Sequence, residues 1–207
     1  MTRELPLVNP GPTPQVAPGV RLAMPVEAWQ LAEIQRREWT DDPLMRRFLD
    51  ETTLEQMAEI WHTSITRPPL ASMRVLVATE PEGAPRATGR ENETQLASRV
   101  VGFAVVGPAQ DEDATGHDGE LSYFRVDPMA RGRGHTSRLL NAAVDTLRAD
   151  RFTRATCWVR STDDDFRALL VGTGWAPDGG HQELGTEDGV VRVKQVRLHT
   201  DISSDGQ

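Results

Sequence analysis

The stretch Val126-Asp-Pro-Met-Ala-Arg131-Gly-Arg-Gly-His-Thr136-Ser-Arg-Leu-Leu140 joins the end of a hydrophobic strand to the start of an amphipathic helix. The first turn of a helix has backbone amides without intrahelical partners and a partial positive charge, so it attracts anions. Glycines in the preceding loop allow close approach of the backbone, and Arg131 and Arg133 add cationic hydrogen-bond donors. The stretch therefore predicts a phosphate-binding turn between a strand and a helix.

Two better-known phosphate-binding motifs do not fit this loop. A dinucleotide fingerprint needs a third glycine where this chain has Ser137, and a P-loop needs Gly-Lys followed by Ser or Thr. An Arg/Gly turn that binds no ligand remains the alternative interpretation of the loop alone.

The elements around the turn predict the fold class. Short apolar runs rich in β-branched residues predict strands, and apolar positions at helical spacing predict helices. Strands are expected at 20–23, 73–79, 100–106, 120–126, 154–160 and 190–198. Helices are expected at 26–39, at 44–49, from 54 until Pro68 and Pro69, at 138–152 and at 162–171. The polar segment 80–98 is expected to be a long connection. This order indicates an α/β fold: a mixed, mostly antiparallel sheet with a central parallel βαβ unit and helices on both faces.

The composition is that of an ordinary globular chain. No apolar run in the 207 residues approaches the roughly 20 residues that cross a bilayer. The net charge of −8 disfavours a nucleic-acid backbone as partner. The single cysteine, Cys157, fits a reducing compartment, so a cytoplasmic location is expected. Residues 1–18 are expected to form a disordered proline-rich leader, 19–200 one domain, and 201–207 a polar tail.

The same stretch resembles the GNAT superfamily of acyl-CoA-dependent N-acyltransferases. Their signature, Gln/Arg-x-x-Gly-x-Gly/Ala, is matched by Arg131-Gly-Arg-Gly134-His-Thr136 except at the last position, where threonine adds a hydroxyl and bulk. The lead-in from Val126 to Pro128 and the pair Leu139-Leu140 also match. The resemblance extends over residues 20–198, with its specific motifs in 120–175. It implies a GNAT-like N-acetyltransferase domain with acetyl-CoA as co-substrate. No metal is expected, because the scattered histidines lack ligand spacing.

The resemblance also implies how the cofactor is held. The amides of Arg133 to Ser137 are expected to bind the pyrophosphate, and the backbone of Phe124 to Val126 is expected to pair with the pantetheine arm like an added strand. The expected cofactor-binding residues are Phe124, Arg125, Val126, Arg131, Gly132, Arg133, Gly134, His135, Thr136 and Ser137. The ring of His135 itself is expected to face solvent.

Glu120 is the expected catalytic base. It begins the strand that should flank the thioester, and the histone-modifying branch of the superfamily has its base glutamate at this spacing. An exposed glutamate at a strand end is the alternative. Strand alternation predicts that Glu120, Ser122, Phe124 and Val126 share one face and that Tyr123 points away.

The general acid is harder to assign. Many relatives have a tyrosine on the helix after the fifth strand, and alignment on Gly174-Trp175 puts Leu170 at that position and Asp163 where they have an asparagine. The usual acid is therefore missing. Tyr123 is expected to be a packing residue, and Cys157 a small buried hydrophobe rather than a nucleophile.

The predicted function is direct transfer of an acetyl group from acetyl-CoA to a primary amine of a small molecule or peptide. The acceptor site is expected near the first two helices, the loop with Asp41 and Asp42, and the final strands, where acids would suit a cationic amine. Three alternatives stay open: a non-catalytic acyl-CoA sensor or regulatory module, transfer of a longer acyl group, and a structural α/β protein. No nucleic acid or membrane partner is expected, and a homodimer is left open.

Overall fold

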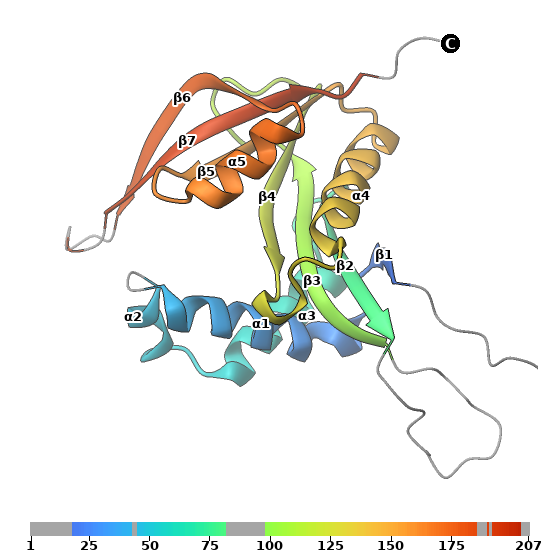
Figure 1. Cartoon of the computed structure of the whole chain (residues 1–207), viewed down its shortest axis with the longest axis vertical. Coiled ribbons are helices and arrows are strands. Elements are labelled where there is room, and N and C mark those ends of the chain that lie inside the picture. Colours follow the sequence, from blue (N-terminus) through green and yellow to red (C-terminus); the bar gives the residue numbers. More distant parts are fainter. Residues whose placement is uncertain (1–17, 43–44, 82–97, 186–189, 191, 204–207) are drawn as a thin grey trace, which may run out of the picture.

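The computed structural model describes residues 18–42, 45–81, 98–185, 190 and 192–203. Within them, seven strands form one sheet in the order β1-β2-β3-β4-β5-β7-β6 (Figure 1). The strands are β1 (Gly19–Leu22), β2 (Arg74–Pro81), β3 (Ser98–Pro108), β4 (Asp118–Val126), β5 (Arg154–Arg160), β6 (Ala176–Gly185) and β7 (Arg192–Asp201). Neighbouring strands are antiparallel except β4 and β5, which are parallel. The predicted fold class is confirmed.

Helices cover the two faces of the sheet and bury two separate apolar clusters. α4 (His135–Ala149) and α5 (Asp164–Gly172) pack on one face, where Leu139, Leu147 and Leu170 join Leu121 and Phe124. α1 (Ala28–Asp41) and α3 (Leu54–Thr66) pack on the other, with the short α2 (Arg46–Leu49) between them in the chain. We call these the α4 face and the α1 face. None of the described helices is long and apolar enough to span a bilayer.

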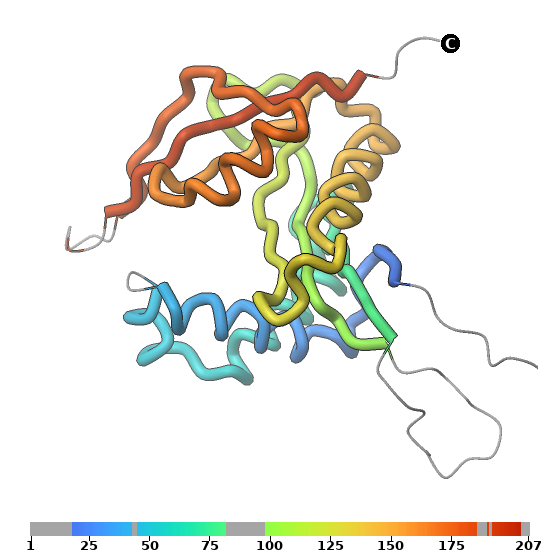
Figure 2. The backbone as a smooth tube through the Cα atoms, in the orientation of Figure 1, coloured from blue at the N-terminus to red at the C-terminus, as the bar shows by residue number. Residues whose placement is uncertain are grey.

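The sheet is splayed between β4 and β5. Their parallel ladder joins only Asp118–Glu120 to Arg154–Thr156. Beyond Glu120 the two strands diverge, as the backbone trace shows (Figure 2). β3 pairs with β4 from Gly119 to Val126, whereas no described strand pairs with the other edge of β4 after Glu120. The splay therefore leaves backbone hydrogen-bonding groups of β4 available in the middle of the sheet.

A bulge in β4 overturns the predicted alternation. Val105 lies opposite Tyr123 and Val106 opposite Leu121, so Ser122 is an extra residue in the ladder. Leu121 and Phe124 consequently both point to the α4 face, and Tyr123 points to the α1 face. The prediction that Glu120, Ser122, Phe124 and Val126 share one face is wrong, because an inserted residue reverses the alternation of those that follow.

The element bounds differ from the predicted ones by a few residues along most of the chain; α4, for example, begins at His135 and ends at Ala149. β6 had no predicted range of its own, and the second predicted helix is only the short α2. β7 continues to Asp201 and Ile202 is 1% exposed, so the packed domain extends past residue 200. Residues 1–17 of the predicted leader and residues 82–97 of the predicted connection lie outside the described residues.

Candidate functional site

The predicted phosphate turn has the backbone geometry of an anion site. A short 3-10 turn, Pro128–Ala130, follows β4, and α4 begins at His135 directly after the loop. Gly132 and Gly134 have φ angles of +76° and +77°, a conformation that glycine adopts without strain. No hydrogen bond to a described residue is made by the backbone amides of residues 132–137. These amides lie at an exposed helix start, so an anion there would satisfy them.

The loop is fixed to the end of β2 by Glu80. The Glu80 carboxylate lies 2.8 Å from an Arg133 guanidinium nitrogen, 3.3 Å from His135 Nε2 and 2.9 Å from Arg99. His135 is 2% exposed, so the expectation that its ring faces solvent is wrong. Burial and the neighbouring Arg138 lower the pKa of His135. Arg133 is thus directed toward Glu80, and its contribution to the loop is structural as well as electrostatic.

A cavity of about 410 Å³ runs from the loop along the open side of β4. Phe124 stacks on Phe166 of α5, with ring centroids 5.2 Å apart. Other predicted cofactor residues also line the cavity, and the complete lining is Glu38, Phe124, Arg125, Val126, Arg131, Thr136, Asp163, Asp165, Phe166 and Leu169. The structure therefore brings five of the ten predicted cofactor residues to one cavity and keeps the remaining five in the adjoining loop.

A polar cluster around Glu38, which no local signal in the sequence indicates, contributes Glu38 and Arg125 to the lining of this cavity. The Glu38 carboxylate of α1 forms an ion pair with Arg125 and accepts a hydrogen bond from the Tyr123 hydroxyl at 3.0 Å. Burial, with the Glu38 charge, raises the pKa of Tyr123. Tyr123 also stacks on Phe103 with centroids 5.1 Å apart, which confirms its predicted packing role. Glu38 lies on the polar side of a predicted helix, and only its distance from β4 in the folded chain reveals the contact.

A second cavity, of about 440 Å³, adjoins the first and contains the acids predicted at the acceptor site. It is lined by Glu38, Asp41, Asp42, Arg125, Arg160, Thr162 and Asp163. Asp42 forms an ion pair with Arg160, which connects the end of α1 to the end of β5. Two arginines therefore already neutralise two of its acids, and the predicted attraction for a cationic amine is weaker than the sequence suggests.

Glu120 lies at the point where β4 and β5 separate. It is opposite Gly107 in β3 and opposite Thr156 in β5. A Cβ on Gly107 would lie 2.8 Å from Met73 Cγ, so Glu120 shares the α1 face with that methionine. No described residue donates a hydrogen bond to its carboxylate. Burial raises the pKa of Glu120 to about 7, and the charge of Asp111 adds to this. A carboxylate with this pKa is suited to accept a proton at neutral pH.

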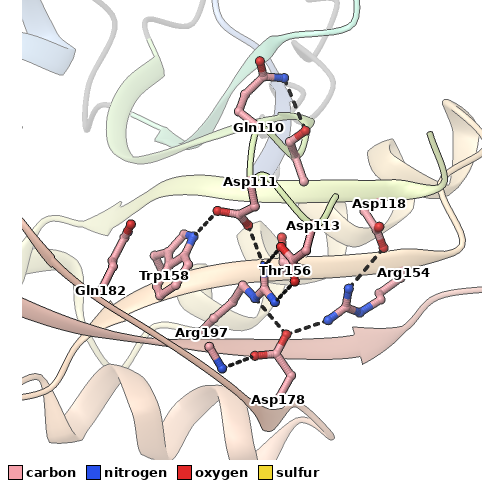
Figure 3. Close-up of polar contacts among 12 residues, drawn as sticks. Gln110, Asp111, Asp113, Asp118, Arg154, Thr156, Trp158, Asp178, Gln182 and Arg197 are labelled. Atoms are coloured by element: carbon pink, nitrogen blue, oxygen red, sulfur yellow. Dashed lines mark hydrogen bonds and ion pairs between the residues drawn. The ribbon is translucent and has the colours of Figure 1, made fainter. Parts of the chain in front are cut away.

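The loop between β3 and β4 is held over β5 and β7 by a buried arginine (Figure 3). Arg197 is 7% exposed, and its guanidinium contacts Asp111 at 3.0 Å, Asp113 at 2.6 Å and Asp178 at 2.8 Å. Asp111 also accepts a hydrogen bond from Trp158 Nε1 at 3.0 Å. The network thereby fixes the carboxylate of Asp111, whose negative charge helps to raise the pKa of Glu120. The sequence gives no local signal for these pairings, because the partners are distant along the chain.

Two other predicted residues lie in the core. Leu170, at the position where relatives have a tyrosine, is 0% exposed, and Cys157 is 2% exposed. Burial raises the pKa of the Cys157 thiol, so it is inert as a nucleophile. Among the described residues, no group of His, Cys, Asp and Glu side chains has the geometry of a metal site.

Comparison with known proteins agrees with this geometry. No curated protein matches the chain. Among solved structures, an N-acetyltransferase from Staphylococcus aureus Mu50 is similar with a TM-score of 0.64 and 16% identity, covering 91% of this chain and all of that one. The yncA protein of Salmonella typhimurium, solved with its cofactor acetyl-CoA, has a TM-score of 0.62 and 16% identity over 93% of this chain and 98% of its own. The ribosomal-protein-alanine N-acetyltransferase of Brucella melitensis has a TM-score of 0.60 and 20% identity over 88% and 98%.

These likenesses establish the fold, and the sequence match establishes the family. The sequence model described as the Acetyltransferase (GNAT) family matches residues 31–171, which include the loop, the cavity along β4 and Glu120. The chain therefore belongs to the GNAT family of acetyltransferases, enzymes that take their acetyl group from acetyl-CoA.

Proposed function

We propose that this acetyltransferase transfers the acetyl group directly to a primary amine, with Glu120 as the base and no acyl-enzyme. The observation that carries the proposal is the position of a partly buried carboxyl, with a pKa of about 7, at the apex of the splay. A direct transfer is favoured because the only cysteine of the chain is buried and its thiol pKa is raised.

The described residues fit the cofactor in two respects. The amides of residues 132–137 have no described partners and suit a pyrophosphate, with Arg131 beside them. The open edge of β4 from Phe124 to Val126 suits the amide groups of a pantetheine arm, which would pair with it as a strand does. Thr136 lines the cavity at the position where the family signature prefers Gly or Ala, so a hydroxyl faces the cavity there.

The residues around the splay supply the proton chemistry. Acetyl-CoA provides a thioester, which is reactive toward a neutral amine. Glu120 would remove the proton of the incoming ammonium, either directly or through one water molecule. The carboxylate accepts this proton readily because burial destabilises its charge. Tyr123 would be a poor acid, since its pKa is raised and its hydroxyl is already bound to Glu38. The nitrogen forms its bond to the acetyl carbon as the C–S bond breaks, and it loses its second proton to solvent. The thiolate leaves without an assigned side-chain acid and takes a proton from water, so one proton is released overall.

The alternative function is an acyl-CoA sensor that binds without turnover. The buried Leu170 favours it, because this chain lacks the tyrosine that many relatives have there. Amine-dependent thiol release separates the two functions: a sensor binds acetyl-CoA and releases no thiol when amines are added.

The test is calorimetric titration with acetyl-CoA of the wild type and of two variants at Gly134. Glycine there has a φ of +77°, which asparagine tolerates better than other residues. Gly134→Asn is the control for shape and Gly134→Asp adds a charge. We expect micromolar binding to the wild type, and binding to Gly134→Asp at least about 100-fold weaker than to Gly134→Asn, because like charges repel at contact distance. Equal affinity of the two variants would mean that the pyrophosphate binds elsewhere.

A further inference from the structure

A third cavity, of about 270 Å³, lies on the α1 face between the end of α3 and the sheet. It is lined by Trp61, Ser64, Pro68, Pro69, Met73, Arg74, Val75, Val105, Ser122 and Tyr123. None of these residues belongs to the phosphate loop, and none lines the cavity along β4. Its volume is below the roughly 300 Å³ at which pockets for drug-sized ligands begin, so it suits a group the size of one large side chain.

The polar side chains that line this cavity already have partners, so they offer no free hydrogen-bonding group to a guest. The Arg74 guanidinium forms an ion pair with Asp150 at 2.6 Å. The Ser64 hydroxyl donates to the carbonyl of Ile60 at 2.9 Å, and the Ser122 hydroxyl donates to the carbonyl of Val105 at 3.4 Å. A charged guest would lose its hydration without gaining a partner, whereas an apolar guest would gain from leaving water.

Two aromatic walls hold the shape of the cavity. Trp61 meets Tyr123 edge to face with centroids 5.8 Å apart, and both contact Phe103. The Trp61 indole also donates a hydrogen bond to Gln35 at 2.8 Å, and the Tyr123 hydroxyl donates one to Glu38. Each ring is thus fixed at both its edge and its polar end, so the cavity needs little rearrangement to receive a guest.

Glu120 lies one row of residues from this cavity, on the same face. Val105 and Tyr123 are directly opposite each other and form its floor. Gly107 and Glu120 form the next row, and Met73 covers Gly107. Residues i and i+2 of a strand lie on the same face, about 7 Å apart. An amine with two or three bonds between its nitrogen and a ring spans this distance. An amine whose nitrogen lies at Glu120 can therefore place its substituent in the cavity.

We propose that this cavity is the acceptor pocket and that it receives the aryl or branched alkyl group of a primary amine whose nitrogen lies at Glu120. The inference rests on the proposed amine acetylation and specifies its substrate class. The third cavity shares no lining residue with the cavity along β4, so the cofactor and the apolar group of the amine would occupy separate spaces beside β4.

The test compares two amines that differ only in the apolar group. Thiol release from acetyl-CoA is measured with 2-phenylethylamine and with ethylamine. We expect kcat/KM to favour 2-phenylethylamine by about 100-fold or more, since one methylene in an apolar pocket changes kcat/KM by roughly 10- to 200-fold. Equal kcat/KM for the two amines would overturn the pocket and leave amine acetylation standing. No release with any amine, despite bound acetyl-CoA, would overturn amine acetylation itself and the pocket with it.

Two further measurements locate the preference. Ser64→Phe fills the cavity, and His62→Phe adds the same ring to an exposed position of α3 as the control. We expect the preference for 2-phenylethylamine to fall at least about tenfold in Ser64→Phe only, the size of a single methylene effect. In the wild type, 2-phenylethanol should inhibit competitively against the amine and not against acetyl-CoA. An unchanged preference together with no inhibition would contradict the assignment.

Discussion

At the scale of single residues, the environment of the proposed base Glu120 destabilises its ionised form. The opposite residue in β3 is Gly107, which has no side chain to donate a hydrogen bond, and Met73 fills that space with an apolar group. Asp111, held by Arg197 and Trp158, adds a like charge. Burial destabilises the ionised form most and the charge of Asp111 adds to this, so the pKa of Glu120 rises to about 7.

We predict that Glu120→Gln lowers kcat/KM by about 10²- to 10⁴-fold, the usual contribution of a general base. In the wild type, kcat/KM should rise with pH through an inflection near 7, as Glu120 loses its proton. Measurement of pH–rate profiles for both proteins tests this. A wild-type inflection that persists unchanged in Glu120→Gln would assign the base to another residue.

The same variant has a predicted effect on stability. Between the ordinary pKa of 4.5 and the raised value of about 7, the folded protein retains a proton that the unfolded chain releases. The free energy of unfolding therefore falls as pH rises through this window. Glu120→Gln should be more stable than the wild type at pH 8, by about 2 kcal/mol after allowance for partial solvent screening, and similar to it at pH 4. Urea unfolding at both pH values measures the difference.

Glu120 and the loop could be proposed from the sequence because their signals are local. Glu120 precedes the loop at a fixed spacing, and Gly132 and Gly134 follow directly after a strand. Glu80 and Glu38 had no such signal, because their partners are distant in the sequence: Glu80 meets His135, and Glu38 meets Arg125. The burial of His135 was missed for the same reason.

At the scale of elements, the bulge in β4 arranges the site. Without an extra residue, Glu120 and Tyr123 would lie on opposite faces of the strand. Ser122 brings them to the same face and leaves Leu121 and Phe124 in the other apolar cluster. One inserted residue thereby places the proposed base beside an aromatic wall.

Deletion of Ser122 should therefore be severe, whereas replacement should be mild. Removal of the residue turns one side of the strand over: either Glu120 leaves the α1 face, or Tyr123 and Arg125 leave it. We therefore expect the unfolding free energy to fall by about 4 kcal/mol or more. Ser122→Ala keeps the residue count and should stay within about 1 kcal/mol of the wild type. Chemical denaturation of both variants tests the prediction. A stable, active deletion variant would show that strand register tolerates the change.

Period-two patterning in the sequence cannot reveal such a bulge, because it assumes the alternation that the bulge interrupts. It also did not locate β6, whose sequence Ala-Pro-Asp-Gly-Gly-His-Gln-Glu-Leu-Gly is largely exposed at the edge of the sheet. By contrast, β5 is buried on one face and was predicted with its observed bounds, Arg154–Arg160.

At the scale of the whole molecule, the fold consists of two parts of a sheet joined at a short ladder. β1 to β4 form one part and β5 to β7 the other, and only the first residues of β4 and β5 pair. Arg197 supports this junction by binding acids from the β3–β4 loop and from β6 (Figure 3). The alternation of strands and helices in the sequence predicts the layers, but the angle between the two parts depends on such tertiary contacts.

We predict that Arg197→Met destabilises the protein by about 3 kcal/mol, because it removes the buried arginine that binds Asp111 and leaves Asp178 with Arg154 alone. The control is Arg192→Met, which removes an exposed pair with Glu183 on the same strand and should cost about 1 kcal/mol or less. Thermal unfolding compares the two variants. Equal melting temperatures would show that the network adds nothing to stability.

The presence of two separate cavities beside β4 has a consequence for the order of events in turnover. A cofactor lying against α4 and α5 and an acceptor lying against α3 would not pass through the same opening. Either could arrive first, and the spent thiol could depart while the acetylated product is still in place. Such an enzyme would form its ternary complex by a random route and would not require one substrate to build the entrance for the other.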